Sequence, residues 1–317
     1  MNKHRVLVSD KLSERGLAVL RAAPEIALDI KVGLKPEELR AIIGSYEALA
    51  VRSATKVTRD IIEAGSALRL IGRAGVGVDN VDLAAAHQRG IAVLNTPGGN
   101  VVSTAEHALA MMFALARKIP MASASVRGGA WEKSKFQGRE IFGKTLGIIG
   151  LGNIGKVVAE RAQGLKMRVV AADPWVSAEA AKALGVEMMP VPALLAAADI
   201  VTLHVPLLDW TKQVISAQAL ASMKSGAMLV NCARGGLCDE AAVAEAVRSG
   251  HLWGAAFDVY AEEPLRPDNP LRGVENIILT PHLGASTDEA QERVAVELAE
   301  AFVEFFQSGV VKNRVSP

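Results

Sequence analysis

Residues 145–155 read Thr-Leu-Gly-Ile-Ile-Gly-Leu-Gly-Asn-Ile-Gly, an apolar run that passes into three closely spaced glycines. The run 145–149 predicts a buried strand, and a helical pattern follows from residue 154 to residue 165. A strand, a glycine-rich turn and a helix in this order are typical of the first βα segment of a doubly wound α/β unit. This stretch therefore predicts the fold class, and the rest of the chain can be read outward from it.

Each glycine of this turn has a predicted function. Gly150 allows the tight turn, Gly152 lets the backbone approach a pyrophosphate, and Gly155 lets the helix pack closely on the strand. The start of the helix adds unpaired N–H groups and a partial positive charge that favour a phosphate. The turn therefore predicts a dinucleotide cofactor site that includes Asn153 and Ile154.

Asp173 follows the next predicted strand, 18 residues beyond the last of these glycines. A carboxylate in this place accepts hydrogen bonds from ribose hydroxyls and repels a 2′-phosphate. The next residues, Pro174 and Trp175, supply no arginine that would compensate for the repulsion. The sequence therefore favours NAD over NADP.

Short apolar runs alternate with helical patterns on both sides of this unit, which indicates parallel α/β sheets. The first hundred residues contain enough elements for a compact domain of their own. Strands are predicted there at Val6–Ser9, Ala27–Lys31, Ala48–Arg52, Leu68–Gly72 and Ile91–Asn95. Helices are predicted at Ser13–Ala23, Pro36–Gly44, Thr58–Ala64 and Val81–Gly90.

A second series of strands follows a long predicted helix, Val101–Lys118, and a polar stretch, Ser125–Gly143, that we expect to be irregular. Its strands are predicted at Thr145–Ile149, Arg168–Ala172, Val186–Met188, Asp199–His204, Ala227–Asn231, Gly254–Asp258 and Asn276–Leu279. A last helix, Thr287–Ser308, is predicted but not placed by the pattern. With 317 residues, half of them hydrophobic, two doubly wound parallel-sheet units are expected.

Composition excludes several classes of protein. A net charge of +1 gives no electrostatic reason to expect nucleic acid or a membrane surface as a partner. The longest apolar stretches fall far short of the roughly 20 residues that a bilayer needs, and the first residues do not resemble a signal peptide. Cys232 and Cys238 offer neither a zinc site nor a disulfide framework, so no metal is expected. We expect a cytoplasmic protein with reduced, buried thiols.

Three polar side chains follow predicted strands of the second series. They are Arg234, Glu263 and His282. Open α/β sheets bind ligands at the carboxyl ends of their strands, so these side chains are expected to meet. Singly, each could be a solvated or structural residue.

The chemistry of an alcohol oxidation requires one group of each kind. Hydride loss needs a base for the hydroxyl proton, and histidine is suited to that exchange. A neighbouring carboxylate stabilises the imidazolium form, and an arginine fork holds a substrate carboxylate. Of the other histidines, His204 ends a strand and is expected near the cofactor. His4, His87, His107 and His251 are expected on the surface or in helix packing.

The chain resembles the D-isomer-specific 2-hydroxyacid dehydrogenases over essentially its whole length. The most specific stretches are 51–58 (Val-Arg-Ser-Ala-Thr-Lys-Val-Thr), 72–82 (Gly-Arg-Ala-Gly-Val-Gly-Val-Asp-Asn-Val-Asp) and 281–287 (Pro-His-Leu-Gly-Ala-Ser-Thr). The resemblance implies that Arg234, Glu263 and His282 form the catalytic trio, and it selects Glu263 over Glu262.

The resemblance also implies further binding residues. Cofactor contacts beyond the glycine turn and Asp173 are expected at Val76, Pro174, His204, Val205, Pro206, Thr211, Cys232, Ala233, Asp258 and Gly284. The substrate side is expected to include Arg52, Ser53, Gly75, Val76 and Asn100. Lys133 and Lys135 are candidates for holding an anionic tail, or they are solvated surface charges.

A discontinuous domain organisation follows from the same resemblance. It implies a flavodoxin-like substrate-binding domain, residues 1–98 and 285–317, to which the last helix returns. A Rossmann NAD-binding domain, residues 99–284, is inserted into it, and the cleft between the two would close over substrate. Family members are dimers through the inserted domain, so we expect a homodimer with Val101–Lys118 and the stretch after it in the interface.

Within the family, the resemblance is strongest to members that oxidise 3-phospho-D-glycerate to 3-phosphohydroxypyruvate in serine biosynthesis. Another 2-hydroxy acid remains an alternative, such as sulfolactate, or glycerate, glyoxylate and hydroxypyruvate. An NAD-sensing binding protein or corepressor on the same scaffold is a remote alternative. Such a protein would not need the catalytic trio, and this chain retains all three residues of it.

Some features depart from the family pattern. Gly98-Gly99 precedes Asn100 where Asn-Gly is common, and Lys133-Ser134-Lys135 replaces a common basic pair, which bears on the preference for phosphate. Long members carry C-terminal regulatory domains that bind serine. Because the sequence ends at Pro317, we expect either a short form or a truncated chain, in both cases without feedback by serine.

Overall fold

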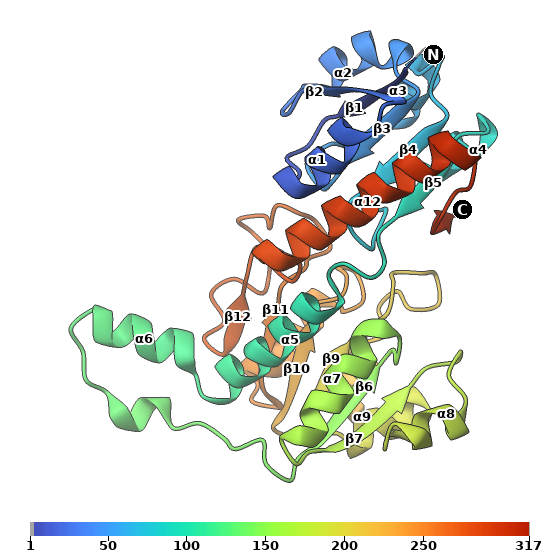
Figure 1. Cartoon of the computed structure of the whole chain (residues 1–317). Coiled ribbons are helices and arrows are strands. Elements are labelled where there is room, and N and C mark those ends of the chain that lie inside the picture. The colour runs from blue at the N-terminus through green and yellow to red at the C-terminus, as the bar shows by residue number, and fades with distance from the viewer. Residues whose placement is uncertain (1–2, 317) are drawn as a thin grey trace. The chain divides into compact units, whose positions relative to one another are not determined.

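A computed structural model describes residues 3–316, which form two compact units (Figure 1). The first unit combines the chain up to Asn100 with the chain from Ala285 onward, and the second unit is Val101–Gly284. Each unit consists of one sheet between two layers of helices. The predicted fold class, doubly wound α/β with parallel sheets, is confirmed.

The sheet of the first unit has the order β2-β1-β3-β4-β5-β13. Its strands are β1 (His4–Val8), β2 (Ile26–Ile30), β3 (Ala48–Val51), β4 (Leu70–Arg73), β5 (Ala92–Asn95) and β13 (Arg314–Val315). The first five are parallel, and the strand order reverses between β1 and β3. The short β13 pairs antiparallel with β5. It was not predicted, because a strand of two residues is too short to show a pattern of apolar residues.

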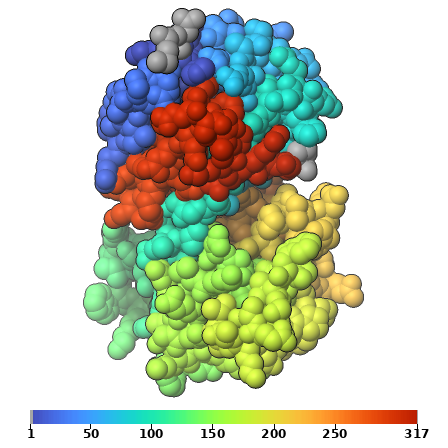
Figure 2. Space-filling view, turned by 45° about the vertical axis from the view of Figure 1, so that its right-hand side comes forward, coloured from blue at the N-terminus to red at the C-terminus, as the bar shows by residue number. Residues whose placement is uncertain are grey.

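Helices cover both faces of this sheet. On one face lie α1 (Glu14–Ala22) and α12 (Asp288–Ser308), and Figure 2 shows α12 in red beside the blue N-terminal elements. On the other face lie α2 (Pro36–Ile42), α3 (Arg59–Ala64) and α4 (Leu83–Gln88), with a 3₁₀ turn at Ile43–Ser45. A Cβ on Gly72 of β4 would lie 2.2 Å from the ring of Phe302, so only glycine allows α12 to pack this closely.

The sheet of the second unit has the order β8-β7-β6-β9-β10-β11-β12 and is parallel throughout. Its strands are β6 (Thr145–Ile149), β7 (Arg168–Ala172), β8 (Glu187–Met188), β9 (Ile200–Leu203), β10 (Ala227–Asn231), β11 (Leu252–Phe257) and β12 (Ile277–Leu279). This is the Rossmann strand order extended by one strand, and the order reverses between β6 and β9. Ligands bind outside the carboxyl ends of the strands at such a reversal.

Six helices cover the second sheet. One face carries α5 (Val101–Ala116), α7 (Asn153–Gly164) and α8 (Ala178–Ala183). The opposite face carries α9 (Val191–Ala197), α10 (Ala217–Ser222) and α11 (Glu240–Arg248). The apolar runs that predicted these strands are therefore buried from both sides, as parallel sheets require.

The expectation of an irregular stretch at Ser125–Gly143 was partly wrong. Helix α6 (Ile119–Arg127) extends into it, and a 3₁₀ helix occupies Lys133–Phe136. Figure 1 shows α6 outside the layers of its unit. None of its residues is fully buried, although Met121 packs partly buried against the core of the unit.

No single helix within residues 3–316 is long and apolar enough to cross a membrane; α5 and α6 meet that length and composition only together, as a pair bent by 62°.

Candidate active site

The glycine turn after β6 has the geometry that its sequence suggests. Gly150 adopts a φ of 97°, and a Cβ on it would lie 2.5 Å from the carbonyl oxygen of His204. A Cβ on Gly155 would lie 2.1 Å from the carbonyl oxygen of Gly150. A Cβ on Gly152, in contrast, would meet no atom within 4 Å. The turn is thus crowded toward the sheet and open above the start of α7, where a pyrophosphate can approach the backbone.

Asp173 lies directly after β7 and supports this turn. One carboxylate oxygen accepts a hydrogen bond from the N–H of Leu151 at 2.8 Å, and the other accepts from the N–H of Trp175 at 2.8 Å. A carboxylate oxygen offers two lone-pair sites, so each keeps capacity for a further donor. The residue can therefore fix the turn and still accept from a ribose.

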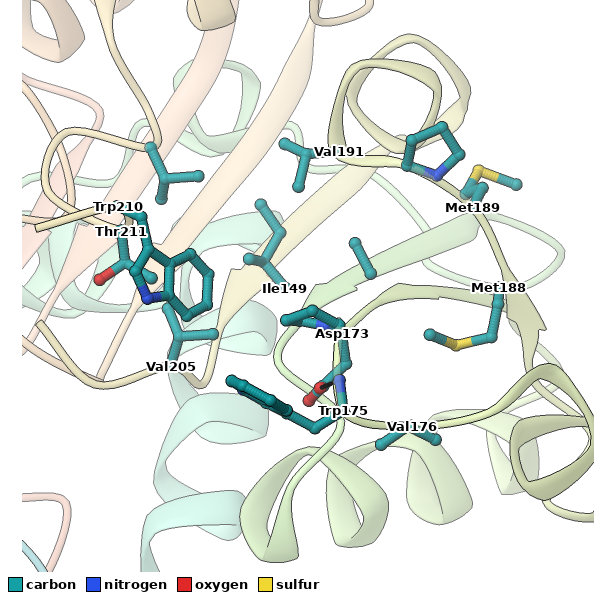
Figure 3. A pocket seen from close by; sticks show the side chains of 14 residues that line it. Ile149, Asp173, Trp175, Val176, Met188, Met189, Val191, Val205, Trp210 and Thr211 are labelled. Carbon is teal, nitrogen blue, oxygen red and sulfur yellow. Dashed lines mark hydrogen bonds between the residues drawn. The ribbon is translucent and has the colours of Figure 1, made fainter. Parts of the chain in front are cut away.

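A cavity of about 680 Å³ opens beside Asp173 (Figure 3). Its walls come from the end of β6 and from the segments after β7, β8 and β9, at the carboxyl edge of the second sheet. Trp175, Val205, Trp210 and Thr211 are among the lining residues, and most of the others are apolar. An apolar cavity with few polar groups beside a phosphate-binding turn fits the adenosine part of a dinucleotide.

The segment after β9 passes against the glycine turn, as the contact between His204 and Gly150 shows. His204 is partly buried, and this burial lowers its pKa to about 4, so the ring is neutral at pH 7. Its Nε2 contacts the hydroxyl of Thr202 at 3.0 Å. Farther along, the buried Thr211 donates to the carbonyl of Pro206 at 2.7 Å and so holds the expected cofactor-binding segment in a fixed loop.

Two members of the trio are in direct contact. His282 Nδ1 lies 2.8 Å from Glu263 Oε2, and the other oxygen of Glu263 accepts from the N–H of Tyr260 at 3.0 Å. Burial alone would raise the pKa of Glu263, but the hydrogen bonds from His282 and Tyr260 outweigh it and hold that pKa below its ordinary value. The carboxylate therefore stays charged beside the imidazole, and the Nε2 of His282 is the ring nitrogen that does not contact Glu263.

The loop that carries Arg234 adjoins the loop that carries Glu263. A Cβ on Gly235 would lie 1.7 Å from the carbonyl oxygen of Tyr260, so the two loops touch along their backbones. Asn231, the last residue of β10, donates to the carbonyl of Arg234 at 2.9 Å and accepts from the N–H of Ala233 at 3.1 Å. The sheet thus brings all three residues of the trio to one edge of the second unit.

Asp258 is completely buried beneath the loop that carries His282. It accepts hydrogen bonds from the hydroxyl of Thr280 (2.6 Å) and from the N–H groups of Leu283 (2.7 Å) and Gly284 (2.8 Å). His107 Nε2 lies 3.2 Å from the same carboxylate. Burial alone would raise the pKa of Asp258, but these hydrogen bonds hold it below its ordinary value. His107 and Thr280 support the site and were not recognised from the sequence.

In the first unit, the loop after β3 is held by a buried carboxylate. Asp10 accepts from the N–H of Arg52 at 2.6 Å and from the hydroxyl of Thr55 at 2.7 Å. Asn80 donates to the carbonyl of Arg52 at 2.9 Å. Partial burial lowers the pKa of Arg52, which still leaves the guanidinium charged at neutral pH. Asp10 is the second residue after β1, so the strand-end rule applied to the first sheet would have found it.

Of the remaining expected substrate residues of the first unit, Gly75 lies close to this loop. Gly75 adopts a φ of 146°, and a Cβ on it would lie 2.1 Å from the guanidinium of Arg73, which itself donates to the carbonyl of Arg52. Asn95 donates to the carbonyl of Val76 at 2.6 Å. Ser53 is exposed, and the buried amide oxygen of Asn100 has no hydrogen-bond partner within the described residues.

Lys133 and Lys135 lie on the exposed 3₁₀ helix after α6. Lys135 pairs with Glu132 at 3.9 Å, and within residues 3–316 neither lysine has an ion pair or hydrogen bond to the trio. The structure therefore does not join these two residues to the other expected substrate contacts.

Both cysteines are buried free thiols. Burial raises the pKa of Cys232 and of Cys238, so each stays protonated at neutral pH. Among the described residues, no group of three or more His, Cys, Asp and Glu side chains is arranged to hold a metal ion.

Comparison with known proteins assigns the chain to a family. Residues 109–284 match the family described as D-isomer specific 2-hydroxyacid dehydrogenase, NAD binding domain. The chain belongs to this dehydrogenase family. Its second unit is accordingly the NAD-binding domain, which confirms NAD as the cofactor and accounts for the glycine turn at the start of α7.

Similar proteins are known in sequence and in structure. The chain is 48% identical to D-3-phosphoglycerate dehydrogenase of Archaeoglobus fulgidus, over 98% of the chain and 59% of that protein. A crystal structure of a Thermus thermophilus protein has a TM-score of 0.89 and 35% identity, covering 98% of this chain and 99% of that one. The D-lactate dehydrogenase of Aquifex aeolicus, solved with NAD and lactic acid, has a TM-score of 0.85 and 28% identity, over 98% and 99% of the two chains.

The chain spans 49–59% of the length of the phosphoglycerate dehydrogenases that it matches. It spans nearly the whole of the solved structures that share its fold.

Replacing Asp258 by asparagine should lower the free energy of unfolding at pH 7 by about 3 kcal/mol or more, because an amide cannot accept hydrogen bonds at both of its ends. The pKa of Asp258 is lowered in the folded protein, so its contribution is fully present above the ordinary value of 3.8 and is lost as the pH falls through the folded value. The difference in the free energy of unfolding between the unmodified protein and Asp258→Asn should therefore shrink as the pH drops below 3.8.

Urea denaturation at a series of pH values measures this difference, and Asp209→Asn, on an exposed loop of the same unit, is the matched control. A difference that grows on acidification would show that Asp258 is not the charged acceptor described above.

Proposed function

We propose that the protein oxidises a (D)-2-hydroxy acid to the 2-keto acid, with NAD as the hydride acceptor. The observation that carries this proposal is the contact of 2.8 Å between His282 and Glu263, in the same domain as the glycine turn. A histidine fixed by a charged carboxylate is the arrangement that general base catalysis requires. The sequence similarity to dehydrogenases of hydroxy acids supports the same assignment.

The roles of the trio follow from its chemistry. His282 accepts the hydroxyl proton of the substrate at Nε2, because Nδ1 is engaged by Glu263. Glu263 stabilises the imidazolium that results, and Arg234 binds the substrate carboxylate through its guanidinium. When bound, the nicotinamide supplies the hydride chemistry. In the reverse direction, the imidazolium returns its proton to the oxygen of the keto acid.

Cofactor binding is assigned to the second unit. Gly150, Gly152 and Gly155 with Asn153 and Ile154 would hold the pyrophosphate, and Asp173 the adenosine ribose. Contacts from the segments after β7, β9, β10, β11 and β12 complete the assignment. They are proposed at Pro174, His204, Val205, Pro206, Thr211, Cys232, Ala233, Asp258 and Gly284, and a further cofactor contact is proposed at Val76.

Substrate binding is assigned to the first unit, and 3-phospho-D-glycerate is the proposed substrate. Arg52 is half-buried in a loop held by Asp10 and Asn80, so it offers a charge in a fixed position for an anionic group. Ser53, Gly75, Val76 and Asn100 complete the proposed substrate side. Lys133 and Lys135 are not included, since the structure does not connect them with these residues.

A homodimer through the second unit is the proposed assembly. Helix α6 has no buried residue, and large apolar side chains are exposed on it and after it, among them Val126, Trp131 and Phe142. Apolar and aromatic exposure of this kind is typical of an interface. We also propose a cytoplasmic location, where the thiols of Cys232 and Cys238 would remain reduced.

Val126→Asp should convert the proposed dimer to a monomer, because a charge would be buried in the interface. Sedimentation velocity measures the change, with Val32→Asp, an equally exposed valine of the first unit, as the control. If the unmodified protein sediments as a monomer, or if both variants sediment alike, α6 is not the interface.

The substrate is tested by the appearance of NADH at alkaline pH. The rate with 3-phospho-D-glycerate is compared with the rates for D-glycerate, D-lactate and sulfolactate. We expect 3-phospho-D-glycerate to be preferred, because the guanidinium of Arg52 is held in a fixed position where it can bind the anionic phosphate of this substrate. Preference for another acid would leave the reaction class intact and change only the substrate. Binding of NADH without turnover of any 2-hydroxy or 2-keto acid would instead favour an NAD-sensing binding protein.

His282→Ala should reduce turnover by about 10²- to 10⁴-fold, the range typical of general acid–base groups, and leave NADH affinity nearly unchanged. Steady-state kinetics and a separate NADH titration measure the two effects. His87→Ala, at an exposed position, serves as the control. Turnover that survives the substitution would remove His282 from the proposed mechanism.

A further inference from the structure

The turn that carries Glu263 has little burial to hold it in place. Residues 261–264 are all exposed, although Tyr260 directly before them is buried. An exposed turn gains little free energy from apolar packing, so its conformation depends on hydrogen bonds to the rest of the fold. The position of Glu263 opposite His282 therefore requires an anchor outside the turn itself.

Glu240, the first residue of α11, supplies such an anchor. Its Oε1 accepts a hydrogen bond from the N–H of Ala261 at 2.7 Å, and its Oε2 accepts from the side-chain amide of Asn269 at 2.6 Å. Ala261 and Asn269 lie on the two sides of Glu263 in the chain, so one carboxylate holds both ends of the segment that carries it. A carboxylate is also favoured in this place, because the first turn of a helix carries a partial positive charge.

Consecutive N–H groups of the backbone are shared between the two glutamates. The N–H of Tyr260 donates to Glu263 Oε1 at 3.0 Å, and the N–H of Ala261 donates to Glu240. The backbone has only two soft dihedral angles per residue, so the orientation of one amide limits the orientation of the next. Loss of the Glu240 carboxylate would free the amide of Ala261 and so loosen the hydrogen bond that orients the Glu263 carboxylate toward His282.

We propose that Glu240 is a positioning residue for the pair formed by Glu263 and His282, and that it acts on this pair through the turn that carries Glu263. The inference rests on the proposed function and adds to it a residue outside the trio. Asn269 completes the anchor, because its Oδ1 accepts from the N–H of Leu271 at 3.0 Å and so directs its amide N–H toward Glu240. A side chain without an acceptor at position 240 would release both donors to solvent.

A double-mutant cycle tests the proposal, with kcat/KM for the oxidation of 3-phospho-D-glycerate by NAD as the readout. Glu240→Ala alone should lower kcat/KM by about 5- to 50-fold, within the range found for coupled residues. In a Glu263→Gln background the same substitution should cost no more than about twofold, because the carboxylate that Glu240 positions is already absent. A residue that contributes to stability alone would show the same loss in both backgrounds.

Two further variants make the test specific. Glu245→Ala is the matched control, an exposed glutamate of α11 whose side chain has no hydrogen bond or ion pair within residues 3–316. Glu240→Gln keeps one side-chain oxygen for the N–H of Ala261, so it should retain more activity than Glu240→Ala. NADH affinity, measured by a separate titration, should stay within about twofold of that of the unmodified protein in every variant. Circular dichroism should show the variants folded, since Glu240 is only partly buried.

Three outcomes would overturn the proposal while leaving the reaction class intact. They are a normal kcat/KM for Glu240→Ala, an equal loss in both backgrounds, and a fall in NADH affinity as large as the fall in turnover. A different result would contradict the proposed function itself, and this inference with it: Glu263→Gln leaves turnover unchanged, or the unmodified protein oxidises no 2-hydroxy acid.

Discussion

Four hydrogen bonds converge on the carboxylate of Asp258, a charge with no exposed surface. Such a charge is tolerated only when its lone pairs are satisfied, and here the donors come from α5, from the residue after β12 and from the loop that follows it. The loop therefore cannot move without leaving the carboxylate unpaired. Because that loop carries His282, the position of the proposed base depends on a residue that does not itself take part in proton transfer.

The first unit has a similar arrangement after β1. Asp10 follows β1 and accepts the N–H of Arg52 in the neighbouring loop, much as Asp258 accepts the N–H groups of Leu283 and Gly284. In both sheets a buried carboxylate at one strand end fixes the backbone of the loop that follows another strand. Side chains proposed to touch substrate are thus presented by rigid backbone, which favours catalysis because less ordering is needed on binding.

The sequence was sufficient for most of the strands and for the glycine turn, and it pointed to the proposed trio, because each of these has a local signature. Thr145–Ile149 is a continuous apolar run, the turn has fixed glycine spacing, and Arg234, Glu263 and His282 are reactive side chains just beyond strands. The supporting residues have no such signature. His107 and Thr280 meet at Asp258 although 173 residues separate them, and nothing in either local sequence points to the other. Helix α6 was also missed, because Pro120 at its start is a signal that ends the preceding helix.

The conformation of His282 shows why the supporting residues matter. Its φ of 57° lies in the left-handed region, which costs a residue other than glycine about 1–3 kcal/mol. Such a conformation persists only where the surroundings determine it. Glu263 holds the ring from one side, and Asp258 holds the two residues that follow. The strained backbone and the buried carboxylate are therefore coupled: relaxing either one would move the imidazole away from Glu263, and the pair on which the proposed chemistry rests would be lost.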